Sequence, residues 1–110
     1  MQKYTIYALA DPSTRHVRYV GSTRNVNKRF TAHVQAAKRG VNHPAYDWIR
    51  GMAPAVPLLI VLQELEISVK RKSPCPIEAA ETKWMKRFER TILNRIDRTR
   101  GSYCNLVNNP

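Results

Sequence analysis

A turn sequence near the N-terminus constrains the fold of this chain more than any other feature. Asp11-Pro12-Ser13-Thr14 separates two short β-type segments, Tyr4 to Ala10 and Val17 to Val20, the second followed by Gly21. Pro sets φ for a turn, and the Asp side chain can accept hydrogen bonds from the backbone ahead of it. The pattern predicts a β-hairpin with a loop of about five residues, so at least two strands of the sheet are antiparallel.

Helix signals follow the hairpin. Asn25 is a capping residue, and the sequence predicts a helix that begins near Val26 and ends before Gly40. Pro44, suited to a first helical turn, opens a shorter helix that stops near Gly51. A third, strongly amphipathic helix follows Pro76, with apolar residues spaced by three and four: Ile77, Ala80, Trp84, Met85 and Phe88. Beyond Arg90 two alternatives stay open, because Ile92, Leu93 and Ile96 suit either a continuation of this helix or another one.

One further strand completes the predicted sheet. Pro57 opens the apolar run Leu58 to Leu62, which is short and branched enough to be a buried central strand. The order is then β-β-α-α-β-α, an α/β sandwich of the α+β type around a small three-stranded, partly antiparallel sheet. The length of 110 residues fits one domain, 1–110.

The charge of the chain points to a polyanionic partner. The chain has nineteen Lys and Arg residues and eight Asp and Glu residues, which gives a net charge of +11. Up to residue 55 there are nine basic and two acidic side chains, so the excess is spread through the domain rather than confined to a tail. Such a field attracts nucleic acid at long range and weakens with salt. Charge that serves solubility alone is the alternative, although small domains usually carry only about 2–8 net charges.

Other classes of protein are excluded or disfavoured. No run approaches the roughly 18 apolar residues of a membrane span, and the N-terminus lacks the apolar core of a secretory signal. Cys75 and Cys104 could form at most one disulfide and lack the clustering of a zinc site, so reduced thiols in a cytosolic protein are the better interpretation.

One carboxylate is placed where a solvated side chain is not expected. On the third predicted helix, Glu81 follows Ile77 by four residues and precedes Trp84 by three, which puts it on the apolar face. A buried carboxylate is costly unless it is paired, protonated or bound to a metal. The alternative is that Glu81 is the solvated edge of the apolar stripe.

Two further pairs are weaker signals. Arg29 and His33, four residues apart on a helix, project side by side and suit a phosphate, although an isolated Arg is usually surface. Tyr7 and Tyr19 lie one on each strand of the hairpin and by pattern are ordinary strand aromatics. A phenol has a pKa near 10, so it acts as a base only beside cations or a metal-bound water.

The order of these residues is more specific than any one of them. Thr5-Ile6-Tyr7, Tyr19-Val20-Gly21, Lys28-Arg29-Phe30 with His33, Glu81 before Trp84, and Asn105 together resemble the GIY-YIG nuclease domain family. The resemblance runs from about Tyr4 to Asn108, and Arg18-Tyr19-Val20-Gly21-Ser22-Thr23 is its most specific part. Thr5 departs from the pattern by replacing the first Gly.

The resemblance implies a metal-dependent endonuclease. Glu81 would hold one divalent metal, Mg²⁺ with Mn²⁺ as substitute, and Arg29 would bind the scissile phosphate. Tyr7 would be the general base, Tyr19 would position water or phosphate, and His33 would hydrogen-bond in the same pocket. Asn105 would order the wall of the site. His43 is a further candidate, against the alternative of an exposed loop His.

The substrate expected from the resemblance is DNA, bound mostly through its phosphates. Seven side chains are the candidate contacts: Arg24, Lys28, Lys38, Arg39, Lys70, Arg71 and Lys72. We expect little sequence specificity, a monomer or homodimer, and a bacterial or phage-encoded cytoplasmic enzyme. Two alternatives are a catalytically inactive nucleic-acid-binding module on the same fold, and an RNA-binding accessory protein that uses its tyrosines for stacking.

Overall fold

The fold has the predicted order of elements. The computed structural model describes residues 2–67 and 76–94. Within them the chain forms three strands and three helices: β1 (Gln2–Ala10), β2 (Val17–Thr23), α1 (Val26–Lys38), α2 (Pro44–Gly51), β3 (Leu58–Ile67) and α3 (Pro76–Arg87). The prediction of an α+β fold in the order β-β-α-α-β-α is confirmed.

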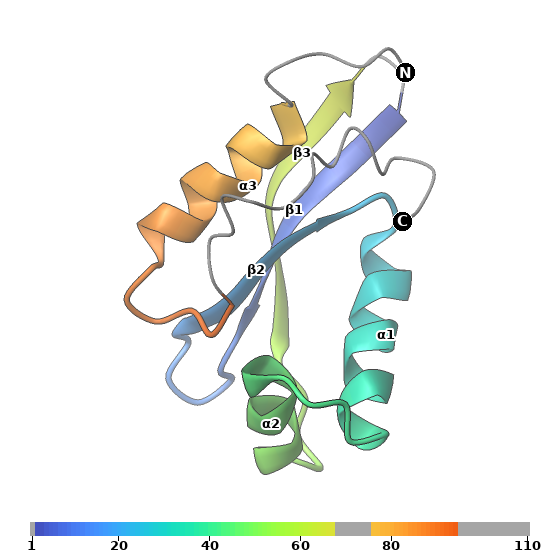
Figure 1. The fold of residues 1–110 in the computed structure, drawn as a ribbon, viewed down its shortest axis with the longest axis vertical. Coiled ribbons are helices and arrows are strands. Elements are labelled where there is room, and N and C mark those ends of the chain that lie inside the picture. The colour runs from blue at the N-terminus through green and yellow to red at the C-terminus, as the bar shows by residue number, and fades with distance from the viewer. Residues whose placement is uncertain (1, 68–75, 95–110) are drawn as a thin grey trace.

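The three strands form one antiparallel sheet that lies between two helical layers. The strand order is β2-β1-β3, and β1 pairs antiparallel with both neighbours. The sheet separates α3, which covers one face, from α1 and α2, which cover the other (Figure 1). Successive residues of β1 therefore point into different layers.

The predicted turn closes the hairpin as its residue types require. Asp11 Oδ1 accepts hydrogen bonds from the backbone N–H of Ser13 at 2.8 Å and of Thr14 at 3.2 Å. The hydrogen bond from the Ser13 hydroxyl, at 2.6 Å, and these two backbone bonds lower the pKa of the Asp11 carboxyl to about 2, because they stabilise its charged form. β2 then runs through Gly21 as far as Thr23, further than its apolar residues alone predicted.

The position of the third strand corrects the sequence interpretation. The run Leu58 to Leu62 was predicted to be a central strand, but β3 lies at an edge of the sheet and β1 is central. Ile60 and Leu62 pack toward α3 and Leu59 packs toward α1 and α2, which accounts for apolar residues on both faces. Val61 is 52% exposed, as an edge position allows.

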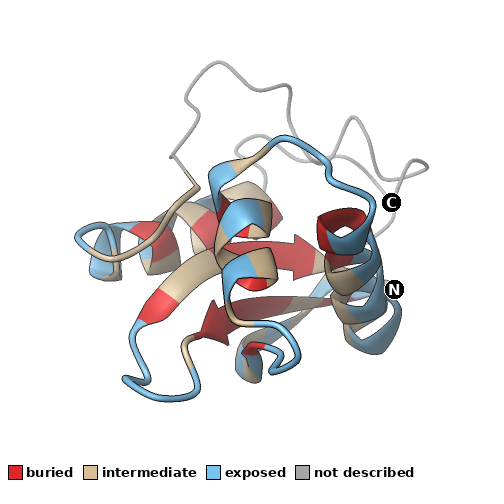
Figure 2. Cartoon of the chain, turned by 90° about the horizontal axis from the view of Figure 1, so that it is seen from below, coloured by how far each residue is buried: buried red, intermediate tan, exposed pale blue. Residues whose placement is uncertain are grey.

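Each face of the sheet has its own apolar core. On one side Ile6 and Ala8 of β1 pack with Ile77 and Met85 of α3. On the other side Leu9 and Tyr7 pack with residues of α1 and α2. Buried residues accordingly lie along the strands and on the helix surfaces that face them (Figure 2). The candidate Tyr7 is thus held by a strand whose residues from Ile6 to Ala10 are at most 1% exposed.

The ends of the helices follow local signals, except after α3. The Asn25 side chain accepts a hydrogen bond from Lys28 N–H and so caps α1, as predicted. α3 ends at Arg87, and the chain then passes beside β2, where Leu93 N–H donates to the Arg18 carbonyl at 2.6 Å. Ile92 and Leu93 therefore belong to no helix, while Ile96 lies outside the described residues. None of the helices described is both long and apolar enough to cross a bilayer.

Candidate active site

The centre of the site is a buried contact between β1 and α1. Tyr7 is 1% exposed and points from the central strand toward α1, while His33 is 1% exposed and points from α1 toward the sheet. The Tyr7 hydroxyl lies 2.6 Å from His33 Nε2. Losing this bond would be costly, because both groups are buried and neither could replace its partner with water.

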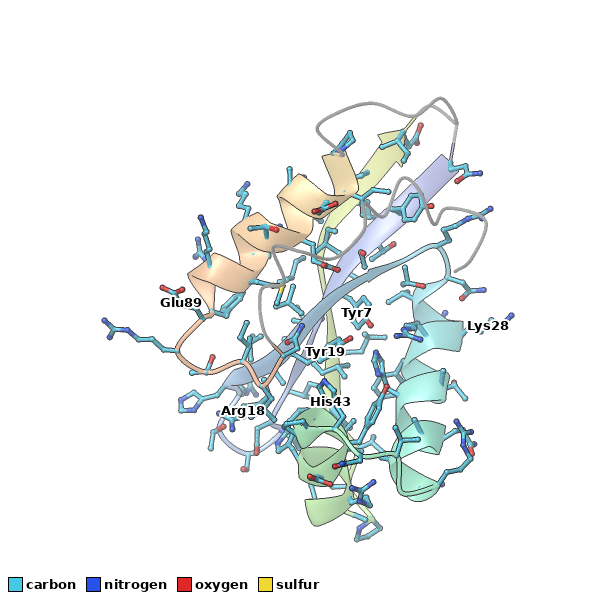
Figure 3. All side chains as sticks on the ribbon, in the orientation of Figure 1. Tyr7, Arg18, Tyr19, Lys28, His43 and Glu89 are labelled. Atoms are coloured by element: carbon cyan, nitrogen blue, oxygen red, sulfur yellow. The ribbon has the colours of Figure 1, made fainter. Side chains whose placement is uncertain are left out.

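Three tyrosine rings surround the imidazole of His33. The ring centroids of Tyr7 and Tyr19 lie 5.8 Å and 4.9 Å from it, and that of Tyr46 lies 5.8 Å from it. Figure 3 shows Tyr7 and Tyr19 between the sheet and α1. The structure thus brings together two tyrosines of different strands with the histidine of the first helix, as the sequence pattern suggested.

Tyr46 was not among the candidates found in the sequence. It lies on α2, and its hydroxyl is 3.3 Å from His33 Nδ1, the ring nitrogen on the side away from Tyr7. No local pattern marks this residue, since one Tyr on a short amphipathic helix is normally part of the core. Only the packing of α2 against α1 brings it to the site.

Gly21 leaves the space that the two hairpin tyrosines occupy. It stands opposite Tyr7 in the β1–β2 register. A Cβ at this position would lie 2.7 Å from the Tyr7 hydroxyl and 2.9 Å from Tyr19 Cε1, both shorter than side-chain contacts allow. The Gly of the Tyr19-Val20-Gly21 segment is therefore required by the close approach of aromatic rings.

Arg29 brings a positive charge to the phenol groups. Partial burial acts to lower the pKa of its guanidinium, but the charge and hydrogen bond of Tyr7, with smaller contributions from Tyr19 and Tyr46, raise it above the ordinary value. The helical spacing of four places Arg29 and His33 on the same side of α1, as predicted. A permanent cation beside a phenol favours the loss of the phenol's proton.

His33 is held in its neutral form. Burial, the positive charge of Arg29 and the nearby His43 together lower the pKa of the His33 imidazole to about 4. At neutral pH the ring therefore carries one N–H and one lone pair, and it can both donate and accept a hydrogen bond.

Glu81 is buried, so its interpretation as a solvated edge residue is wrong. It lies on α3 with 2% of its surface exposed, and the Ser22 hydroxyl donates to its Oε2 at 3.0 Å. Gly21 and Ser22 are consecutive on β2, so their side chains belong to opposite faces of the sheet. The Glu81 carboxylate therefore lies on the α3 side of the sheet, whereas Tyr7 packs on the side of α1 and α2.

Of the two remaining candidates, His43 caps a helix and Asn105 lies outside the described residues. His43 is half-buried, and its Nδ1 accepts the Ala45 N–H and so caps α2, beside the Tyr46 ring. Asn105 lies outside the described residues. Asn94, which sequence reasoning missed, holds the wall of the site: its amide donates to the Val20 carbonyl at 2.8 Å and its Oδ1 accepts the Val20 N–H at 3.2 Å.

The candidate phosphate contacts are separated in space. Arg24 and Lys28 are exposed near the start of α1, and Figure 3 shows Lys28 pointing away from the sheet. Lys38 and Arg39 are exposed at the other end of α1, about 14 Å further along the axis from Arg29. Lys70, Arg71 and Lys72 lie outside the described residues, as do both cysteines.

The sequence matches the model of a known catalytic domain. The model of the GIY-YIG catalytic domain matches residues 3–95. The chain belongs to the GIY-YIG family. Membership implies nuclease-type activity and a nucleic-acid substrate. The match includes both hairpin tyrosines, Arg29, His33 and Glu81, but it ends before Asn105. Neither a curated protein nor a solved structure matches this member of the GIY-YIG family.

The chemistry of the site fits the single metal ion that a GIY-YIG domain is expected to use. The described residues contain no group of three or more His, Cys, Asp or Glu side chains that could hold a metal by themselves. Glu81 offers one hard oxygen-donor group beside a hydroxyl. A magnesium ion suits such a sparse donor set, because it keeps most of its waters and binds through one or two carboxylates and substrate phosphates.

Proposed function

We propose that the protein is a metal-dependent endonuclease that hydrolyses phosphodiester bonds in DNA with little sequence specificity. The observation that carries the proposal is the buried Tyr7–His33 hydrogen bond beside the Arg29 cation. A buried phenol hydroxyl needs a hydrogen-bond partner for stability alone, but it does not need a cation beside it. Arranged in this way, the phenol has an acceptor for its proton and a cation that stabilises its anion.

In the proposed reaction, Tyr7 is the general base. The Tyr7 phenolate takes a proton from the attacking water, and the water oxygen forms a bond to phosphorus while the bond to the 3′ oxygen breaks. Arg29 binds the non-bridging oxygens, where negative charge increases in the transition state. Tyr19, whose ring stands 6.1 Å from that of Tyr7, positions the water or the phosphate.

Glu81 is the proposed metal ligand, with Ser22 orienting its carboxylate. When bound, Mg²⁺ or Mn²⁺ would supply positive charge that stabilises the phosphorane and the departing oxygen. DNA binding itself would depend on exposed cations such as Arg24 and Lys28, which position the backbone without reading sequence.

The test is a cleavage assay on supercoiled plasmid and on a labelled single-stranded oligonucleotide, each with Mg²⁺, with Mn²⁺ and with EDTA. We expect metal-dependent cutting that Glu81→Ala abolishes while DNA binding is kept. Glu89→Ala is the matched control, because Glu89 is an exposed carboxylate just beyond α3 (Figure 3). Equal cutting by Glu81→Ala and the parent chain would refute the proposal.

The second candidate function is a catalytically inactive nucleic-acid-binding module. The net charge of +11 favours it as much as it favours a nuclease. A binding surface has no use for a buried carboxylate, however, and Glu81 is buried. Salt-sensitive binding with no cleavage by the parent chain in any metal would support this alternative and contradict the enzyme.

A further inference from the structure

The imidazole of His33 lies between two phenol hydroxyls, and the proposed reaction uses only one of them. Tyr7 Oη is 2.6 Å from Nε2, and Tyr46 Oη is 3.3 Å from Nδ1. The hydroxyls come from different elements, β1 and α2, and the histidine from α1. Tyr46 is half-buried, whereas Tyr7 is 1% exposed, so the chain of hydrogen bonds leads from the interior toward the surface.

The hydrogen bonds of Tyr7 indicate which ring nitrogen of His33 carries the hydrogen. The guanidinium of Arg29 can only donate, so in its hydrogen bond with Tyr7 the phenol oxygen is the acceptor. The Tyr7 hydroxyl hydrogen is then available for His33 Nε2, which lies 2.6 Å from the phenol oxygen and accepts it. A neutral imidazole then carries its hydrogen on Nδ1 and donates it toward the Tyr46 oxygen.

This tautomer determines how Tyr7 can lose its proton. If Nε2 accepted the Tyr7 proton and nothing else moved, His33 would become a cation in a buried position beside Arg29. That state is unfavourable, since the pKa of His33 lies at about 4. Transfer of the Nδ1 proton to Tyr46 avoids the cation and leaves Nε2–H as a donor to the new phenolate.

We propose that Tyr46 is a positioning residue that holds His33 as the Nδ1–H tautomer and accepts the Nδ1 proton when Nε2 takes the proton of Tyr7. The proposal rests on the proposed function, in which Tyr7 is the base. The Tyr7 O–H and His33 Nδ1–H bonds break, and Nε2–H and Tyr46 O–H bonds form. Tyr46 passes its original hydroxyl proton to solvent water, so one proton leaves the site and His33 ends neutral.

The titratable side chains that surround His33 were compared as possible acceptors of its Nδ1 proton. From the elements packed around the ring they are Tyr7 of β1, Tyr19 of β2, Arg29 of α1, and Tyr46 of α2 with its capping residue His43. None of these groups is a carboxylate, so within this set no carboxylate competes with Tyr46 for the Nδ1 proton.

The first test reads the tautomer directly and needs no activity. We would record ¹⁵N NMR spectra of the imidazoles in the parent chain and in Tyr46→Phe, with His33→Gln to assign the signal by its loss. In the parent chain Nδ1 should be protonated and Nε2 should be a hydrogen-bonded lone pair. In Tyr46→Phe the hydrogen should move to Nε2, because a buried N–H without an acceptor costs more than a bare lone pair.

Tyr4→Phe is the matched control for this test. Tyr4 is a buried tyrosine on β1 that packs toward α3, and its hydroxyl makes only a long 3.5 Å contact with Gln2. This variant should leave the His33 spectrum unchanged. A parent chain with Nε2–H, or the same tautomer in parent and Tyr46→Phe, would overturn the proposal even if the protein cuts DNA.

The second test separates chemistry from binding. Tyr46→Phe should lower kcat for DNA cleavage by at least about tenfold, a part of the roughly 10²–10⁴-fold that positioned proton transfer contributes, with KM unchanged. The rate should also require higher pH, since Tyr7 then loses its proton without the relay. An unchanged kcat and pH profile would refute the role of Tyr46. An inactive parent chain with the expected tautomer shift would instead refute the proposed nuclease.

Discussion

Gly21 stands opposite Tyr7 across the β1–β2 ladder, and a Cβ at Gly21 would lie 2.7 Å from the Tyr7 hydroxyl. The same hydroxyl is hydrogen-bonded to His33 Nε2 at 2.6 Å. The Tyr7 ring therefore cannot move away from position 21 of β2 without changing its hydrogen bond to His33. One glycine thus determines whether the Tyr7–His33 bond can form.

Gly21→Ala should therefore disrupt the site. We expect the free energy of unfolding to fall by about 1–3 kcal/mol, the usual cost of overpacking, and DNA cleavage to be largely lost. Urea unfolding and a plasmid assay measure the two effects. Gly51→Ala is the control, because nothing lies within 4 Å of its Cβ position and a helical Gly→Ala change stabilises by up to about 1 kcal/mol. A Gly21→Ala protein as stable and active as the parent would contradict this account.

Tyr7→Phe should separate catalysis from folding. It removes the hydroxyl and keeps the ring, so we expect cleavage to fall roughly 10²–10⁴-fold with DNA binding unchanged. The variant also leaves the buried Nε2 of His33 without its partner, which should destabilise the fold by about 1–3 kcal/mol. Single-turnover cleavage and urea unfolding provide the measurements. Tyr4→Phe serves as control, and a comparable loss of cleavage in that variant would show that the effect is not specific to the site.

Asn94→Ala should weaken the wall of the site. The side chain makes two hydrogen bonds with the backbone of Val20, the residue between Tyr19 and Gly21. Losing both should lower the free energy of unfolding by about 1–3 kcal/mol and reduce cleavage, because β2 is then held less firmly. Asn94→Asp places a carboxylate oxygen against the Val20 carbonyl in place of the amide donor, so it should destabilise the fold at least as much as Ala. Asn27→Ala, at an exposed position of α1, should change neither quantity by much.

His33 should make stability depend on pH between about 4 and 6.5. Its pKa is lowered from 6.5 to about 4 in the folded chain, so the unfolded chain binds the extra proton within this window. The contribution is complete above pH 6.5 and declines as the pH falls through the window. Each pKa unit corresponds to about 1.4 kcal/mol, so up to about 3 kcal/mol is involved.

Urea unfolding of the parent chain and of His33→Gln at pH 4.5 and pH 7 measures this effect. The parent should lose more stability than the variant on going to pH 4.5. Asp11, whose pKa is lowered to about 2, acts in a different range, because its contribution is present above pH 3.8 and declines below it. Parallel pH profiles for the two chains would show that His33 is not the group responsible.

Sequence reasoning found the elements whose signals are local. The Asp11 turn, the Asn25 cap and the Pro44 helix start all depend on hydrogen bonds or sterics within a few residues, and the structure contains each of them. The burial of Glu81 was one of two interpretations that its helix pattern allowed, since apolar residues three and four positions away share its helix face, and the structure decides for it. The order of the tyrosines, Arg29 and Glu81 was sufficient to identify the family.

The predictions from the sequence were wrong or incomplete where segments far apart in the chain come into contact. The apolar run of β3 was read as a central strand, although an edge strand covered on both faces carries the same residues. The sequence did not indicate a role for Asn94, because its hydrogen-bond partner Val20 is 74 residues away in the chain. The sequence did not indicate a role for Tyr46 either, because only the packing of α2 against α1 brings it into contact with His33.

The amino-acid sequence by itself determined the residue types of the site, the order of strands and helices, and the positive charge, because these depend on composition and on short-range periodicity. Only the tertiary structure decided that β1 is central, that Gly21 makes room for Tyr7, and that His33 stands between two hydroxyls. Those relations depend on distances between segments far apart in the chain, which no local pattern specifies. The tautomer that we propose for His33 therefore depends on the packing of α2 and β1 against α1.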